Sequence, residues 1–337
     1  MKKNAILYEK LPHGKVQCHT CQRRCIIPPG KSGWCLTRVN EEGVLYTLIY
    51  GEVSSLSINP IEKKPVFHFY PGSRWLSLGS LGCNFRCPGC QNWEIAHWKG
   101  KEPRGTYYLS PEDQVKMAIN QGCLGLSWTF NEPTIWFEYT LDSAKLAKKK
   151  GLYTNYVTNG FITEEALDTI TPYLDVYRVD VKGFSADTYE KIAHTPDFGL
   201  VLKGAENAKR CGMHVEVVTN IIPGLNDDEK ELRGIASWIK SNLGPNTPWH
   251  VTRFHPYLKL SHLYPTPVST LEQAREMGVE AGLWYVYIGN IPGHDGENTY
   301  CHNCGSLLIK RYIFDILDNR IRDGRCPECE TKIPGRF

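Results

Sequence analysis

The feature that most limits how this chain can fold is a regular alternation of strand-like and amphipathic segments from about residue 75 onward. Strands are predicted at residues 75–81, 123–129, 152–158, 176–182, 214–220, 249–254 and 284–289. Helices are predicted from Ser110 to Gly122, from Asn226 to Gly244, and over residues 269–281. Strand–helix alternation at this spacing predicts parallel β/α units. Six or more units favour an α/β fold built as a partial or full TIM-like barrel.

Two cysteine-rich segments lie outside this alternation. We expect three parts: a metal module at residues 1–50, the β/α barrel at 51–295, and a second metal module at 296–337. With 41% hydrophobic residues and a net charge of +3, the 337-residue chain is typical of a globular protein. The charge gives no support for nucleic-acid binding, and no apolar run reaches the roughly 18 residues of a membrane span.

Cysteine placement argues for metal ligation rather than disulfides. Of 13 cysteines, 11 fall in three tight clusters, and only Cys123 and Cys211 stand alone. A disulfide framework is typical of short secreted chains with a signal peptide, and the N-terminal segment has no credible one. We therefore expect a cytoplasmic protein, with Cys123 and Cys211 as buried, unreactive thiols.

The central cluster follows the first predicted strand. Cys83, Cys87 and Cys90 have the spacing C-x3-C-x2-C, and three thiolates from one loop can bind three irons of a [4Fe–4S] cube. No fourth cysteine is adjacent, so the fourth iron could take an external ligand such as S-adenosylmethionine. The competing interpretation is a three-cysteine zinc site, but the loop occupies the position of a barrel's first active-site loop.

This motif resembles that of the radical S-adenosylmethionine (radical SAM) superfamily. The resemblance implies that one electron passes from the cluster to the sulfonium. The S–C5′ bond then breaks, and a 5′-deoxyadenosyl radical abstracts hydrogen from a substrate. The residue before the third cysteine is usually aromatic in that superfamily, and here it is Gly89.

Polar residues follow the later predicted strands, where a β/α barrel gathers its functional groups. Taken singly, each has an ordinary interpretation as a turn residue, a solvated lysine or a helix-start acid. Together, and by resemblance to superfamily segments that contact S-adenosylmethionine, they suggest one cofactor-binding set. The set comprises Gly89, Gln91, Asn131, Glu132, Thr158, Asn159, Asp180, Lys182 and His255.

The terminal clusters predict two further metal sites. At the C-terminus, two C-x2-C pairs with 21 residues between them suit a closed structural zinc site, with rubredoxin-type iron as the competitor. At the N-terminus the spacing is C-x2-C-x3-C-x9-C, and zinc and an auxiliary iron–sulfur cluster both remain open. The ligands would be Cys301, Cys304, Cys326 and Cys329 at one end, and Cys18, Cys21, Cys25 and Cys35 at the other.

Further segments narrow the resemblance to the radical SAM component of the AmmeMemoRadiSam system, a family described as pyruvate-formate-lyase-activating-enzyme-like. They are residues 60–65, 68–72, 91–93, 132–134, 298–301 and 333–335. The resemblance implies a cluster and a radical precursor, with Ammecr- and Memo-type proteins as partners and a flavodoxin or ferredoxin as electron donor. It does not supply the substrate.

Three functions are therefore consistent with the sequence. The first is a radical enzyme that activates a partner protein, as glycyl-radical-enzyme activases do. The second is direct radical modification of a small molecule. The third, from a different class, is a zinc-stapled scaffold or RNA-binding protein, which a chain containing only zinc would favour.

Overall fold

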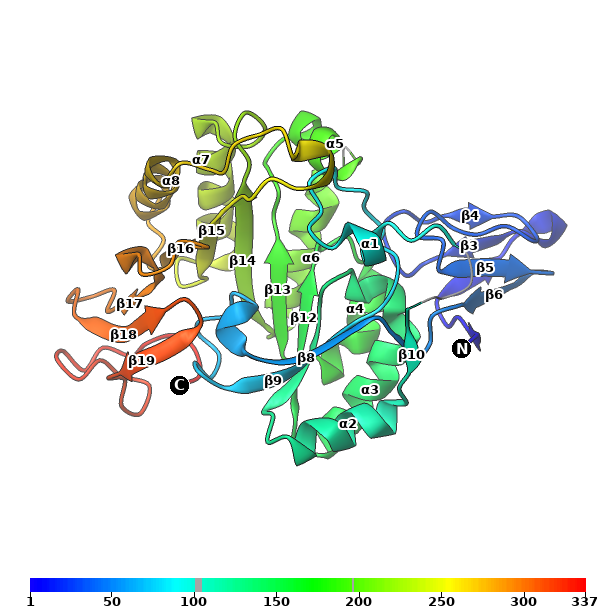
Figure 1. Cartoon of the computed structure of the whole chain (residues 1–337), viewed down its shortest axis with the longest axis horizontal. Helices are drawn as coiled ribbons and strands as arrows, with labels where there is room; N and C mark the ends of the chain where they lie inside the picture. The colour runs from blue at the N-terminus through cyan, green and yellow to red at the C-terminus, as the bar shows by residue number, and fades with distance from the viewer. Residues whose placement is uncertain (101–104, 196) are drawn as a thin grey trace. The chain divides into compact units, whose positions relative to one another are not determined.

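The computed structural model describes residues 1–100, 105–195 and 197–337, and its fold is mixed α/β with a large, mostly parallel sheet of eight strands (Figure 1). The predicted fold class is confirmed. The chain forms two compact units, the first made of Met1–Asn59, Arg74–Tyr177 and Gly199–Met213. The second unit comprises Pro60–Ser73, Arg178–Phe198 and His214–Phe337. The boundaries proposed from sequence at residues 50 and 295 stay a prediction.

The first unit carries one half of the sheet, in which β11 runs parallel to both β9 and β12. The strand order here is β12-β11-β9-β8. The bounds are Ser55–Pro60 for β8, Arg74–Gly79 for β9, Gly125–Trp128 for β11 and Tyr153–Thr158 for β12.

The second unit carries the other half, in the order β16-β15-β14-β13. Strand β15 is parallel to β14 and β16. The bounds are Val176–Asp180 for β13, His214–Ile221 for β14, Trp249–Arg253 for β15 and Val286–Gly289 for β16. All seven strands predicted from sequence are present as β9 and β11 to β16, within a few residues at each end.

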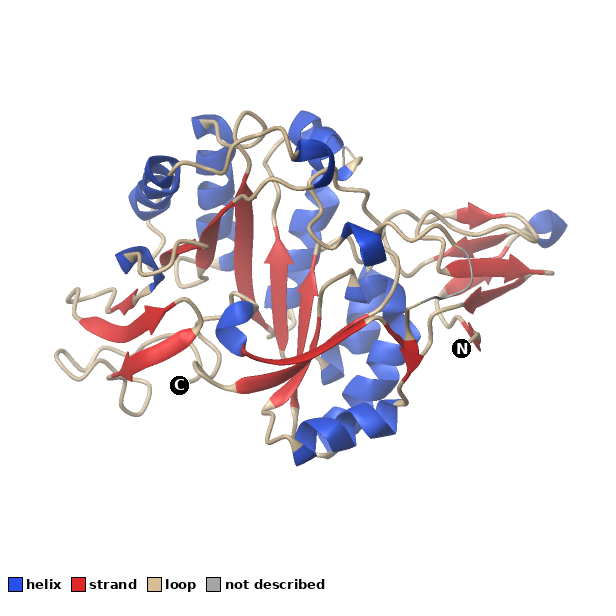
Figure 2. Ribbon diagram, in the orientation of Figure 1, coloured by secondary structure: helices blue, strands red, loops and turns tan. Residues whose placement is uncertain are grey.

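The helices follow the local signals in the sequence, and Figure 2 shows them in blue against the red strands. Helix α2 begins after Ser110, whose hydroxyl accepts a hydrogen bond from the Asp113 amide. The first unit holds α1 (Trp93–Ala96), α2 (Pro111–Asn120), α3 (Phe137–Lys149), α4 (Glu164–Ile170) and nearly all of α6 (Phe198–Arg210). The second holds α5 (Ala186–Ala193), α7 (Glu229–Trp238) and α8 (Val268–Glu280). No helix in the described ranges is long and apolar enough to cross a bilayer.

Small antiparallel sheets carry the terminal cysteines. In the first unit the orders are β1-β6-β5, β2-β3-β4 and β10-β7, and in the second β17-β18-β19. The bounds are Lys3–Asn4, Tyr8–Lys10, Val16–Cys18, Ile26–Ile27, Arg38–Glu41, Val44–Thr47 and Glu52–Val53 for β1 to β7, Tyr107–Tyr108 for β10, and Thr299–Tyr300, Leu307–Tyr312 and Asp315–Asn319 for β17 to β19.

A buried carboxylate organises the core of the second unit. Glu216, on β14, accepts hydrogen bonds from the Phe67 and His68 amides and from the rings of His214 and His250. Burial opposes its ionisation, yet the hydrogen bonds from the two histidines hold the pKa of Glu216 well below its ordinary range. The two main-chain amides and two imidazole rings around Glu216 are therefore all hydrogen-bonded to its carboxylate.

Candidate functional site

The loop that follows β9 presents three cysteines, Cys83, Cys87 and Cys90, and all three side chains are partly exposed. Arg86, within the loop, donates hydrogen bonds to the carbonyls of Cys83 (2.9 Å) and Ala96 (3.2 Å). The loop conformation is therefore fixed from inside by one guanidinium.

Glu132 is the hub beside this loop. Its Oε1 accepts hydrogen bonds from the Thr134 amide (3.0 Å) and the Thr158 hydroxyl (2.7 Å), and its Oε2 accepts one from the Asn159 amide (2.8 Å). The side chain is buried, and burial raises the pKa of Glu132 while these hydrogen bonds oppose the rise. One carboxyl group therefore ties the end of β12 to the segment that follows β11.

Asn159 connects this hub to the cysteine loop. Its Nδ2 donates to Asn84 Oδ1 (2.7 Å) and lies 3.8 Å from the Cys83 sulfur. The Phe85 amide donates to the same sulfur at 3.4 Å. Glu132, Thr158, Asn159 and Cys83, which the sequence predicted as parts of one site, are thus brought together by direct contacts.

The other predicted residues of the first unit lie around the same loop. Asn131 accepts a hydrogen bond from the Ser80 amide (2.9 Å) and donates to the Gly82 carbonyl (2.9 Å), so it braces the exit from β9. Gly89 is partly exposed beside Cys90, and Gln91 is exposed. Their role in cofactor binding stays a prediction.

Three predicted residues belong to the second unit. Asp180, at the end of β13, pairs with Arg178 (2.6 Å) and lies 3.8 Å from the Lys182 ammonium. The Lys182 carbonyl accepts a hydrogen bond from Asn226 at 2.8 Å. His255 is exposed after β15. These three residues also stay predictions as cofactor-binding groups.

The sequence reasoning did not single out Asn84 or Arg86. Asn84 is fully buried although it belongs to a loop. Arg86 donates the hydrogen bonds that fix the loop from inside. The available signal was their position inside the C-x3-C-x2-C motif, where a buried amide and a guanidinium can satisfy main-chain carbonyls.

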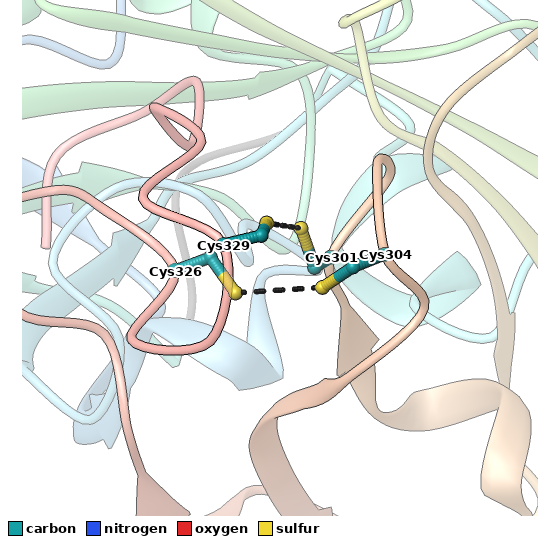
Figure 3. Close-up of side chains that lie close together, drawn as sticks. All are labelled: Cys301, Cys304, Cys326 and Cys329. Carbon is teal, nitrogen blue, oxygen red and sulfur yellow. Dashed lines mark hydrogen bonds between the residues drawn. The ribbon is translucent and has the colours of Figure 1, made fainter.

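The C-terminal cysteines form a compact group, shown in Figure 3. The sulfur atoms of Cys301 and Cys329 are 3.6 Å apart, and those of Cys304 and Cys326 are 3.7 Å apart. All four sulfurs lie within 4.8 Å of one another. This geometry can hold a metal ion.

Each of the two C-terminal loops closes with the same turn. Gly305 and Glu330 directly follow the second cysteine of each pair, and their φ angles are +77° and +57°. Their amides donate to the carbonyls of Cys301 (2.9 Å) and Cys326 (3.0 Å). Left-handed backbone suits glycine, whereas Glu330 adopts it at some cost in strain.

The N-terminal cysteines share one small pocket in the first unit. Cys18, Cys21, Cys25 and Cys35 all line it, and all four are free thiols. Arg38 also lines the pocket, held by a buried ion pair in which its Nη2 lies 2.8 Å from Glu138 Oε2. The four cysteines therefore lie around one space, and their role as metal ligands stays a prediction.

The fold is α/β, and the loop after β9 carries three cysteines beside the hydrogen-bonded polar ends of β11 and β12. This combination is typical of enzymes that bind an iron–sulfur cluster. Comparison with known proteins agrees, because the sequence model of the radical SAM superfamily matches residues 78–239. The chain belongs to the radical SAM superfamily.

Two curated relatives mark its position within that superfamily. The chain is 45% identical over 333 residues to uncharacterized protein MJ0808 of Methanocaldococcus jannaschii, and the aligned region covers 98% of each chain. It is 27% identical over 189 residues to the pyruvate formate-lyase-activating enzyme of Clostridium pasteurianum, covering 53% of this chain and 77% of the relative.

Solved structures share the fold. A radical SAM methyltransferase from Sphaerobacter thermophilus aligns over 71% of both chains with a TM-score of 0.52 and 14% identity. Streptococcus suis SuiB bound to S-adenosylmethionine aligns over 72% of this chain and 56% of its own, with a TM-score of 0.50 and 14% identity. At these identities the likeness concerns the fold alone.

Superfamily membership implies a [4Fe–4S] cluster and S-adenosylmethionine. The residues present fit the cluster, because three cysteines share one loop and hydrogen-bond donors already approach the Cys83 sulfur. Donors of this kind are the outer contacts that tune a cluster's thiolate ligands.

Proposed function

We propose that this chain cleaves S-adenosylmethionine reductively and uses the resulting radical to activate a partner protein by hydrogen abstraction. Cys83, Cys87 and Cys90 would hold the [4Fe–4S] cluster. When bound, that cluster would supply the electron that breaks the S–C5′ bond of S-adenosylmethionine. The protein's own part is to hold the ligands and keep water away from the reactive group.

The observation that carries this proposal is the contact of the strand-end network with the cluster loop. Because Glu132 fixes Asn159 and Asn159 approaches Cys83, the ends of two neighbouring β/α units are held at one sulfur ligand. Glu132 and Asn159 are both buried, so polar groups here act in a medium of low dielectric, where they are worth more than in water.

The choice of a protein substrate rests on the activating enzyme among the relatives. That enzyme is named for pyruvate formate-lyase, and the chain matches 77% of its length. The second candidate is direct modification of a small molecule. It is favoured by relatives from Saccharolobus islandicus named as probable GTP 3′,8-cyclases, which are 29% identical over 179 residues. The chain spans about half the length of those relatives, 54%.

The test starts from protein purified without oxygen and reduced with dithionite. Wild-type protein should form 5′-deoxyadenosine from S-adenosylmethionine, and Cys87→Ala should form none. Cys211→Ala is the matched control. The prediction that Cys211 is buried was wrong, because it lies exposed just after α6, and it belongs to none of the three cysteine clusters. Production of 5′-deoxyadenosine by Cys87→Ala would refute the cluster assignment.

A second arm of the experiment separates the two candidate substrates. A stable glycyl radical signal in an added partner protein would support activation, whereas a mass change in a small molecule would support direct modification. We propose Ammecr- and Memo-type proteins as the first partners to try, because the sequence resembles the AmmeMemoRadiSam family. A flavodoxin or ferredoxin is the proposed physiological reductant.

We also propose that the metal at Cys301, Cys304, Cys326 and Cys329 is structural zinc. Zinc binds thiolates at about 2.3 Å, and tetrahedral geometry then separates the sulfurs by about 3.8 Å. The two sulfur–sulfur distances of 3.6 and 3.7 Å fit one tetrahedral ion. Four cysteines leave no open position on it, so the site would stabilise the fold rather than react.

A further inference from the structure

The N-terminal cysteines are a second candidate for redox chemistry. Cys18, Cys21 and Cys35 are buried, Cys25 is partly buried, and together they line one pocket. None is in a disulfide, although four thiols surround the same space. Four thiols around one space, three of them buried and none in a disulfide, suit the ligand set of a thiolate metal centre.

Two of these four sulfurs accept hydrogen bonds from neighbouring groups. The Trp34 amide donates to the Cys25 sulfur at 3.4 Å, and the Thr37 hydroxyl donates to the Cys35 sulfur at 3.2 Å. The loop cluster shows the same pattern, in which the Phe85 amide donates to Cys83. Such donors stabilise negative charge on a metal-bound thiolate.

The spacing of the sulfurs separates this site from the C-terminal one. Among the residues that the structure describes, the group at Cys301 to Cys329 is the one in which three or more donor atoms lie within 4.8 Å of one another. Neither the N-terminal set nor the loop set is that compact. A single zinc ion needs sulfurs close to one centre, whereas a cube holds each sulfur at a separate corner.

The N-terminal run also has the same reach as the loop. Cys18, Cys21 and Cys25 lie within eight residues, as do Cys83, Cys87 and Cys90, with the two spacings in reversed order. The fourth N-terminal ligand, Cys35, comes from the next turn of chain. The N-terminal set therefore resembles the loop set in spread and adds the fourth thiol that the loop lacks.

The two cysteine segments also contact each other directly. Arg86, in the loop, donates to the Trp34 carbonyl at 3.1 Å, and Arg23 donates to the Asn84 carbonyl at 3.0 Å. Gly82 has a φ of +81°, and a Cβ there would lie only 3.0 Å from the Cys35 carbonyl oxygen. A side chain at Gly82 would push the two segments apart.

We propose that Cys18, Cys21, Cys25 and Cys35 hold a second [4Fe–4S] cluster, fully ligated by protein, packed against the loop that carries Cys83. This goes beyond the proposed function, because it concerns a separate site and holds whatever the substrate is. With four thiolates the second cluster has no open iron, so it binds no S-adenosylmethionine.

Metal analysis of anaerobically purified protein tests the proposal. Wild-type protein should contain about eight irons and eight sulfides, and Cys21→Ala about four of each, with its zinc content unchanged. Cys211→Ala should match wild type. If Cys21→Ala instead lost zinc and kept all its iron, or lost neither metal, the second cluster would be excluded.

A second variant covers the case in which Cys21→Ala does not fold. Replacing Cys83, Cys87 and Cys90 together by alanine leaves the N-terminal module intact. This variant should keep about four irons, with an electron paramagnetic resonance signal that S-adenosylmethionine leaves unchanged. If this variant contained no iron, the proposal would be refuted. If it contained two irons, the assignment of a four-iron cluster to the N-terminal site would be refuted. Formation of 5′-deoxyadenosine by wild type reports on the loop cluster separately.

Discussion

Glu132→Gln perturbs the hub of the site by a single atom exchange. Oε1 of the native side chain accepts from Thr134 and Thr158, while Oε2 accepts only from the Asn159 amide. A glutamine that keeps its oxygen at the Oε1 position therefore retains two hydrogen bonds. Its NH2 group then faces the Asn159 amide, so one hydrogen bond is replaced by a contact between two donors.

The expected cost follows from that count. A hydrogen bond to a charged group contributes about 1.5–3 kcal/mol, so losing one should lower the free energy of unfolding by about 2 kcal/mol. Release of Asn159 should also loosen its contact with the Cys83 sulfur, now 3.8 Å away. We expect iron content to stay near wild type while 5′-deoxyadenosine formation falls.

Urea unfolding, iron analysis and product assay on one preparation would measure all three quantities. Glu164→Gln is the matched control, because Glu164 makes only an exposed ion pair with Arg210 at 3.4 Å. Such a surface change should alter stability by less than about 0.5 kcal/mol. If Glu132→Gln were as stable and as active as this control, the hub would have no energetic role.

Three further predictions concern the rest of the chain. Cys304→Ala should release the C-terminal metal and cost at least about 3 kcal/mol, and unfolding as stable as that of Cys211→Ala would argue against structural zinc. Glu138→Ala leaves the buried Arg38 guanidinium without its ion-pair partner and should lower the free energy of unfolding in urea by about 3–5 kcal/mol. The double variant Arg38→Met with Glu138→Leu should restore most of that stability, and no recovery would contradict the pairing argument. Burial lowers the pKa of His68 to about 4, so the stability contributed by its neutral ring is complete above pH 6.5 and is lost as pH falls toward 4. A His68→Gln protein should therefore lose less stability than wild type between pH 7 and pH 5, and an equal loss would count against the burial of His68.

The fold was largely predictable because its signals are local. Ser110 caps α2 as expected, and Gly244, with a φ of +95°, ends the helical segment predicted from Asn226. The helix itself begins later, after Asp228, whose carboxylate accepts a hydrogen bond from the Glu231 amide. A cap is defined by the geometry of a few consecutive residues, so its position can be displaced without changing the element.

The candidate site was predictable in its members but not in its connections. Glu132 and Asn159 were predicted as members of one set because each follows a strand, where a β/α barrel gathers its functional groups. Their segments also resemble those that contact S-adenosylmethionine in the radical SAM superfamily. That one carboxylate would join three donors, and that Asn84 would be buried to receive Asn159, depends on contacts between residues as far as 75 positions apart. Periodicity carries no record of such pairings.

The three cysteine sets show why counting thiols does not identify a metal. At the C-terminus, the two C-x2-C pairs lie in separate turns that face each other, and the turns at Gly305 and Glu330 bring four sulfurs within 4.8 Å of one another. At the N-terminus, three thiols share one eight-residue run, whose backbone keeps them around a pocket without that close approach. Both sets contain four cysteines and a C-x2-C pair, so the sequence left zinc and iron–sulfur open for the second. The close approach of the four C-terminal sulfurs fits one tetrahedral ion, and this is information that cysteine spacing in the sequence does not contain.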